Sequence, residues 1–199
     1  QSVAQVAGNL LVGAPAAWAI SRLRFRGRSM VRGLYIVLML LPFQVTMVPS
    51  YLVLRQFGLL DTPWAIILPG IFSTFPVFIM ERGFDTIPRE VLESASIDGA
   101  NQWQRFWRIG IPLGIPGLIS ALTLGFLDAW NAIEQPMTFL ESPQYWPLSL
   151  FFTDPANLDT KQLGLAMPAS LWMLLPSILV FRFGQTYLEA GLTKGAVKG

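Results

Sequence analysis

Long apolar runs are the feature that most restricts how this chain can fold. Five of them lie at about 3–20, 30–54, 64–80, 111–130 and 163–183. Each approaches the roughly 17–25 residues that a helix needs to cross a hydrocarbon core of about 30 Å. Only 13% of the residues are charged, against roughly 25% in a soluble domain. We therefore expect an all-α integral membrane protein, a polytopic bundle whose runs are its spans.

Proline residues interrupt these runs. They are Pro15, Pro42, Pro49, Pro69, Pro76, Pro116, Pro168 and Pro176. Proline removes a backbone donor and bends a helix, but neighbouring spans can satisfy the freed carbonyl groups inside a membrane. We therefore expect kinked helices that pack closely together.

The distribution of basic residues predicts the orientation. Alternating spans place 21–29, 81–110 and 184–199 on one side of the membrane, and 55–63 and 131–162 on the other. When boundary residues such as Arg32 and Arg182 are counted with the nearer side, all of the 14 Lys and Arg residues except Arg55 and Lys161 fall on the first side, which the positive-inside rule makes cytoplasmic. We expect a multi-pass cell-membrane protein with a cytoplasmic C-terminus. Gln1 would then lie outside, so we expect a leading span before it.

The residue types present exclude several kinds of chemistry. The sequence has no histidine and no cysteine, which removes Ser-His and thiol nucleophiles and most zinc sites. It has no GxxxxGK[ST] phosphate loop. The sequence pI of about 9.2 reflects the cytoplasmic arginines, and no basic patch indicates nucleic acid. We expect no metal, cofactor or nucleic-acid partner for this chain.

The polar segment 81–110 separates the third and fourth runs. Pro88 suits a first helical position, with Asp85 or Thr86 as the cap, and Gly99 suits a left-handed helix end. A short helix held in this way could dock in a groove of another protein. The alternative is an interfacial helix on lipid headgroups, which the aromatic residues at 103–107 favour only for the second half of the segment.

The same segment resembles the EAA motif of importer permeases of the ATP-binding-cassette (ABC) type. That motif reads EAA, three residues, G, nine residues, I-x-L-P, and Ser94 and Ile111 are the two departures from it. The resemblance implies a type I ABC importer permease in which 81–110 is a cytoplasmic coupling loop. Its coupling helix would dock on an ATPase subunit that binds ATP and magnesium. The docking residues implied are Glu93, Ser94, Ala95, Asp98, Gly99 and Ala100.

The resemblance extends to carbohydrate permeases of the maltose-transporter type. The ending GLTKGAVKG at 191–199 and the segment GLLDT at 58–62 are similar to that branch. This implies a sugar cargo, such as a disaccharide, an oligosaccharide or a polyol, moved by alternating access. It also implies a second permease subunit as a heterodimer partner and an extracytoplasmic solute-binding protein facing 131–162. The tail residues implied to contact the ATPase are Gly191, Leu192, Thr193, Lys194 and Gly195.

Polar and aromatic residues inside the spans are candidates for the transport path, because such groups tend to face the bundle interior. They are Gln44, Thr74, Phe75, Asp128, Trp130 and Asn131, with Thr46 and Ser73 nearby in sequence. Each also has a simpler structural interpretation. A Ser or Thr within a span often forms a hydrogen bond to its own helix, and a Trp near the end of a span often lies at the membrane interface. A permease for a non-sugar solute, a membrane-embedded enzyme and a secondary transporter stay open as alternatives.

Overall fold

The computed structural model describes residues 1–151 and 163–196, with the backbone alone for 151, 163–169 and 190–196. The described residues form helices and no strand, which confirms the all-α expectation for them. The helices are α1 (Ser2–Arg22), α2 (Arg28–Leu40), α3 (Phe43–Gln56), α4 (Trp64–Ile71), α5 (Thr74–Asp85), α6 (Arg89–Ile97), α7 (Gln102–Arg105), η1 (Phe106–Gly110), α8 (Ile111–Asn131), α9 (Glu134–Phe139), η2 (Pro143–Tyr145), α10 (Leu148–Phe151) and α11 (Leu163–Ala196).

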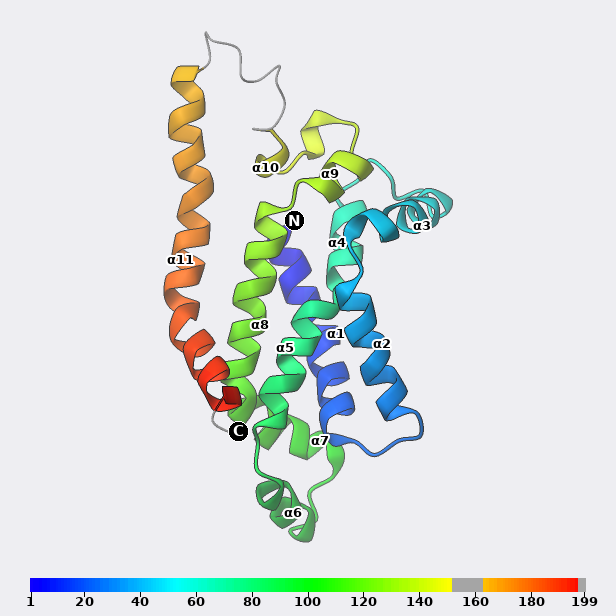
Figure 1. Ribbon diagram of the computed structural model, residues 1–199, viewed down its shortest axis with the longest axis vertical. Coiled ribbons are helices and arrows are strands. Elements are labelled where there is room, and N and C mark those ends of the chain that lie inside the picture. Colours follow the sequence, from blue (N-terminus) through cyan, green and yellow to red (C-terminus); the bar gives the residue numbers. More distant parts are fainter. Residues whose placement is uncertain (152–162, 197–199) are drawn as a thin grey trace.

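The centre of the molecule is a group of long helices, α1, α4, α5 and α8, with α11 alongside α8 (Figure 1). Its largest buried cluster joins α1, α5 and η1. The Trp18 ring lies 5.3 Å from the Phe84 ring, edge to face, and 5.8 Å from the Phe106 ring. All three side chains are at most 4% exposed. Aromatic burial therefore holds together the end of the bundle from which α6 projects (Figure 1).

Three helical stretches in the described part are long and apolar enough to cross a membrane: Ser2–Arg22, Trp64–Asp85 and Gln102–Asn131. The stretch predicted as one span at 30–54 passes the same test only as a bent pair of helices, α2 and α3, whose axes differ by 102°. The break falls at Leu41, whose backbone is extended, before Pro42. A residue before proline is disfavoured in helical conformation, which explains where the helix stops.

The third predicted span is also interrupted, between α4 and α5, and side chains of α1 form hydrogen bonds to carbonyl groups at the interruption. Pro69 lies inside α4, and Ser73 at the break has an extended backbone. The Asn9 side-chain amide donates to the carbonyl oxygens of Ile71 at 2.9 Å and Ser73 at 3.1 Å. The Gln5 amide donates to Ile66 O at 3.0 Å. Two side chains of a neighbouring helix thus bond carbonyl groups at and near the break, where a helix inside a membrane can lose its own partners.

Helices α5 and α8, which enter and leave the polar segment, cross at a pair of glycines. A Cβ built on Gly117 would lie 2.5 Å from the Cα of Gly83, and one built on Gly83 would lie 2.6 Å from the Cα of Gly117. Small residues let two membrane helices approach to backbone contact. This crossing holds the two stems of the segment that carries α6 together.

At the opposite end of the bundle, Asp61 fastens the segment after α9 to the loop between α3 and α4. Its Oδ1 accepts hydrogen bonds from the amides of Glu141 at 2.9 Å and Ser142 at 2.7 Å, and its Oδ2 accepts from the Ser142 hydroxyl at 2.5 Å. Its own amide donates to Phe139 O at 2.9 Å. The hydrogen bonds from Ser142 and Glu141 lower the pKa of Asp61.

Replacing Asp61 by asparagine should loosen this attachment. Asn tolerates the left-handed φ of 55° found here, so the change removes the charge and one acceptor without adding backbone strain. We expect clearly faster hydrogen exchange at the amides of Glu141 and Ser142, measured by mass spectrometry at neutral pH. Glu141→Gln is the matched control, because only the backbone of Glu141 is bonded to Asp61. Unchanged exchange in Asp61→Asn would contradict the anchoring role.

The lowered pKa also fixes the pH range of this attachment. A carboxyl group whose pKa is lower in the folded state stabilises that state above its unfolded value, about 3.9, and the stabilisation is lost as the pH falls through the folded value. Amide protection at 141–142, corrected for intrinsic exchange, should therefore persist from neutral pH to about pH 4 and fall only below it. The asparagine variant should show no such transition.

Candidate functional site

Helix α6 projects beyond the bundle at the end where α1 finishes and α2 begins (Figure 1). None of its residues is buried. Glu93, Ser94, Asp98 and Gly99 are exposed, whereas Ala95 and Ala100 are partly covered. Within the described part of the chain, no hydrogen bond or ion pair occupies the side chains of Glu93 and Asp98. The predicted docking residues therefore present two free carboxylates on a short, accessible helix.

The predicted boundaries of this helix are confirmed at its end and wrong at its start. Gly99 has a φ of 81°, and the Ala100 amide donates to Ala95 O across it at 2.9 Å. Pro88 is the N-cap and not the first helical residue, and no side chain caps the helix. Asp85 does not cap because it bonds Ser21 and Arg32. Thr86 does not cap because its hydroxyl donates to Gly83 O at 2.8 Å.

The return stretch after α6 is anchored in the bundle. Asn101 and Gln104 form a capping box at the start of α7, each bonding the other's backbone amide at 2.8 Å. The chain then passes through a single turn of π-helix, in which Phe106 is 1% exposed against Trp18 and Phe84. Leu92 of α6 packs on the same cluster. A displacement of α6 would therefore act directly on the aromatic core.

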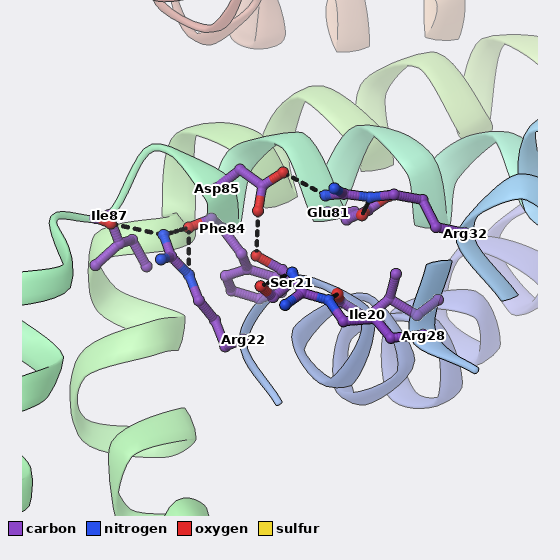
Figure 2. A network of polar contacts seen from close by, with 9 residues as sticks. All are labelled: Ile20, Ser21, Arg22, Arg28, Arg32, Glu81, Phe84, Asp85 and Ile87. Atoms are coloured by element: carbon purple, nitrogen blue, oxygen red, sulfur yellow. Dashed lines mark hydrogen bonds and ion pairs between the residues drawn. The ribbon is translucent and has the colours of Figure 1, made fainter. Parts of the chain in front are cut away.

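A network of polar contacts ties α1 and α2 to the residues just before α6 (Figure 2). The Arg22 guanidinium donates to the carbonyl oxygens of Phe84 and, at 2.6 Å, of Ile87. Arg28 donates to the carbonyl oxygens of Ile20 and Ser21, both at 2.6 Å. These arginines occupy carbonyl groups at the ends of α5 and α1, where cations are favoured by the helix dipole.

The strongest contact in the network is a charged one between α2 and α5. Arg32 forms an ion pair with Glu81 and another with Asp85, the latter at 2.6 Å. Asp85 also accepts a hydrogen bond from the Ser21 hydroxyl at 2.7 Å. Glu81 is only 2% exposed, so its charge depends on Arg32 for compensation. The three helices α1, α2 and α5 are therefore joined immediately before α6.

A second feature is a cavity of about 700 Å³ lined by residues of α1, α2, α3, α4, α5, α8 and α9. Its polar lining combines amides, hydroxyls and one carboxylate with aromatic rings. The residues concerned are Gln5, Asn9, Thr46, Ser50, Ser73, Thr74, Asp128 and Gln135, with Phe43, Phe72 and Phe75. Pockets with aromatic walls and a few converging polar groups are the usual form of small-molecule sites.

The structure brings half of the predicted path residues to this cavity. Thr74, Phe75 and Asp128 line it, as do Thr46 and Ser73. Gln44 instead donates to both carboxylate oxygens of Glu134, at 2.9 and 3.0 Å. Trp130 donates to Met173 O of α11 at 2.9 Å, and Asn131 donates to Leu127 O of its own helix at 2.7 Å. For these three, the local contacts favour a packing role over a place on the path.

Sequence reasoning missed four polar lining residues: Gln5, Asn9, Ser50 and Gln135. The sequence pattern could have indicated two of them as lining residues. Gln5 and Asn9 are amides four residues apart in an apolar run, so they share one face of a helix, and polar groups in spans face the interior. The predicted tail residues 191–195 belong to α11 by their backbone. Their side chains, and residues 152–162 and 197–199, lie outside the described part.

The sequence profile of one protein family, described as "Binding-protein-dependent transport system inner membrane component", matches residues 9–194. The chain belongs to this family. Its apolar helices and this membership make it a multi-pass membrane protein. Its relatives are permease subunits of ABC transporters, and such subunits are not enzymes themselves.

Two relatives and one solved structure show which kind of permease this chain is similar to. It is 33% identical over 192 residues to the inner membrane ABC transporter permease protein YcjP of Escherichia coli (strain K12), covering 96% of this chain and 69% of YcjP. It is 31% identical to the diacetylchitobiose uptake system permease protein DasC of Streptomyces coelicolor (strain ATCC BAA-471 / A3(2) / M145), covering 100% of this chain and 72% of DasC.

The crystal structure of a bacterial ABC transporter involved in import of the acidic polysaccharide alginate shares its fold. One chain of it superposes with a TM-score of 0.75 and 26% identity, over 94% of this permease and 71% of that chain. The fold expected from the resemblance, a bundle of the ABC importer permease kind, is thus confirmed.

Proposed function

We propose that this permease is the membrane subunit of an importer that carries a sugar into the cytoplasm, driven by ATP hydrolysis in partner subunits. The proposal rests on the exposed helix α6, which lies in the chain between α5 and α8, two helices that are in backbone contact at Gly83 and Gly117. The named cargoes of relatives supply the substrate class, since DasC takes up diacetylchitobiose and the related solved transporter imports alginate. Both are carbohydrates.

In this proposal α6 is a coupling helix that docks on a cytoplasmic ATPase subunit. Its exposed carboxylates Glu93 and Asp98, next to the small residues Ser94 and Ala95, suit a polar contact in a narrow groove. The residues 191–195 would add a contact from the C-terminal end of α11. The cytoplasmic side is then the α6 end, in agreement with the arginines gathered there.

The transport path in this proposal runs through the cavity lined by Thr74, Phe75 and Asp128. Its aromatic rings and neutral hydrogen-bonding groups match the two kinds of surface that a sugar presents. A second permease subunit would complete the path, and a solute-binding protein would deliver the sugar at the end that carries α9. Closure and opening of the ATPase dimer would move the bundle between two access states.

Glu93→Ala tests the docking role. We expect the complex to assemble but ATP-driven uptake to fall about tenfold, because a buried, charge-assisted contact at an interface is worth about 1.5–3 kcal/mol. The measurement is uptake per ATP hydrolysed in proteoliposomes that contain the complete transporter and its binding protein. The matched control is Glu90→Ala, which removes a carboxylate from the first turn of α6, outside the motif.

Unchanged coupling in a normally assembled Glu93→Ala complex would contradict the docking role of α6. Uptake that persists without ATP, or that follows an ion gradient, would contradict the importer proposal itself and favour a secondary transporter.

A further inference from the structure

The one ionisable side chain that lines the 700 Å³ cavity, among the described residues, is acidic. Among the described residues that line it, Asp128 is the ionisable one, and no lysine or arginine is among them. Every other polar lining group is a neutral amide or hydroxyl. A sugar in this cavity would therefore meet hydrogen-bonding groups and one carboxylate.

Asp128 is also unpaired, unlike the carboxylates near α6. Its side chain is exposed and has no hydrogen bond or ion pair with any described residue. Glu81 and Asp85, by contrast, share Arg32. An ionisable residue within a span is costly and commonly marks a substrate pathway. Asp128 is exposed on the wall of this polar cavity, so its carboxyl group meets whatever enters.

The surroundings of the cavity do not cancel that charge. Glu134, next to the lining residue Gln135, is bonded to the amide of Gln44, which is neutral and brings no positive charge. Helix α2, which supplies the lining residues Leu38 and Met39, also carries Arg28 and Arg32 in its first two turns. Arg32 is paired with two carboxylates, and Arg28 donates to the carbonyl oxygens of Ile20 and Ser21. Because Asp128 is the charged residue on the wall, we expect a negative field in the cavity, and a cleft lined by one sign of charge concentrates ions of the opposite sign.

We propose that this cavity selects neutral or positively charged saccharides, such as amino sugars, and rejects uronic acids and other anionic sugars, with Asp128 as the residue that sets this preference. The inference rests on the proposed transport path through the cavity. A sugar carboxylate at Asp128 would face a like charge, whereas an ammonium or hydroxyl group would donate a hydrogen bond to it.

Labelling of an introduced cysteine measures the charge of the cavity directly. Residues 1–199 contain no cysteine, so Thr74→Cys places the single thiol of these residues on the cavity wall. The complete transporter is treated with a cationic and an anionic methanethiosulfonate of similar size, and the mass of this chain reports modification. Rates are divided by those for free cysteine to remove intrinsic reactivity.

We expect the cationic reagent to react about tenfold faster than the anionic one, the lower end of the enrichment produced by a charged cleft. Asp128→Asn should remove most of that preference. Glu141→Gln, which removes a carboxylate outside the cavity lining, should leave it unchanged. Rates that do not depend on reagent charge, or a preference that survives Asp128→Asn, would overturn the proposal.

Protection from labelling extends the test to sugars. Diacetylchitobiose, its deacetylated cationic form and digalacturonate are compared at equal concentration, as a neutral, a cationic and an anionic disaccharide. Protection by digalacturonate equal to that by the other two would overturn the charge selection. If the transporter with Asp128 in place shows no charge preference but imports sugar normally with ATP, only this inference is refuted. If it shows the charge preference but ATP does not drive uptake, the proposed function is refuted.

Discussion

Arg32→Met is expected to destabilise the bundle by about 3 kcal/mol, the lower end of the cost of breaking a buried ion pair by removing one partner, because the Arg32 side chain is itself 32% exposed. The cost is high because Glu81 is 2% exposed and would be left buried without a counter-charge. The variant should show a clearly lower midpoint of thermal unfolding for the purified complex in detergent, followed by tryptophan fluorescence.

The double variant Arg32→Met, Glu81→Met should recover most of this loss. Replacing a whole buried pair by apolar residues is often neutral or stabilising. Arg82→Met is the matched control, since Arg82 is exposed, lies 4.8 Å from the Phe78 ring and forms no ion pair with any described residue. An Arg32→Met complex as stable as the parent, or a double variant no better than the single one, would show that the pair does not support the junction before α6.

Gly117→Val should destabilise the bundle by about 3 kcal/mol, the upper end of what overpacking usually costs. The obstruction is backbone, because a Cβ at this position would lie 2.5 Å from Gly83 Cα, and backbone cannot rotate away as a side chain can. The separation of α5 from α8 should also alter coupling, since these helices carry α6. Thermal unfolding and uptake per ATP hydrolysed measure the two effects.

Gly33→Ala is the control for that substitution. Gly33 also lies within a helix, but nothing lies within 4 Å of the Cβ that the change would add. Alanine is favoured over glycine in a helix by about 1 kcal/mol, so this variant should be neutral or slightly more stable. A Gly117→Val complex that behaves like Gly33→Ala would show that α5 and α8 can separate freely at the crossing.

Much of the fold could be predicted because its signals are local. Apolar run length predicts spans, and Gly99 predicts a left-handed helix end. The 102° bend was harder. Pro42 explains the stop of α2, but the direction of α3 depends on packing against α9, where the Phe43 and Phe139 rings lie 5.9 Å apart. That contact joins segments far apart in the sequence, which a reading of local pattern does not bring together.

The candidate site shows the same limit. Asp85 has the residue type and position of a helix cap, yet Arg32 and Ser21, which come from other helices, occupy its oxygens. Gln44 and Trp130 are polar or aromatic in the spans, as path residues are, but each finds a partner elsewhere. Residue type therefore indicates what a side chain can bond, and the packing of the helices decides which partner it meets.

The amide of Asn9 limits how the helices around it can move. It donates to two carbonyl oxygens that flank the break between α4 and α5, so an axial shift of α1 by one helical turn, about 5.4 Å, would break both bonds inside the membrane. Helices α1, α4 and α5 should therefore travel as a single body. Any change in access to the cavity then falls to its boundaries with α2, α3 and α9.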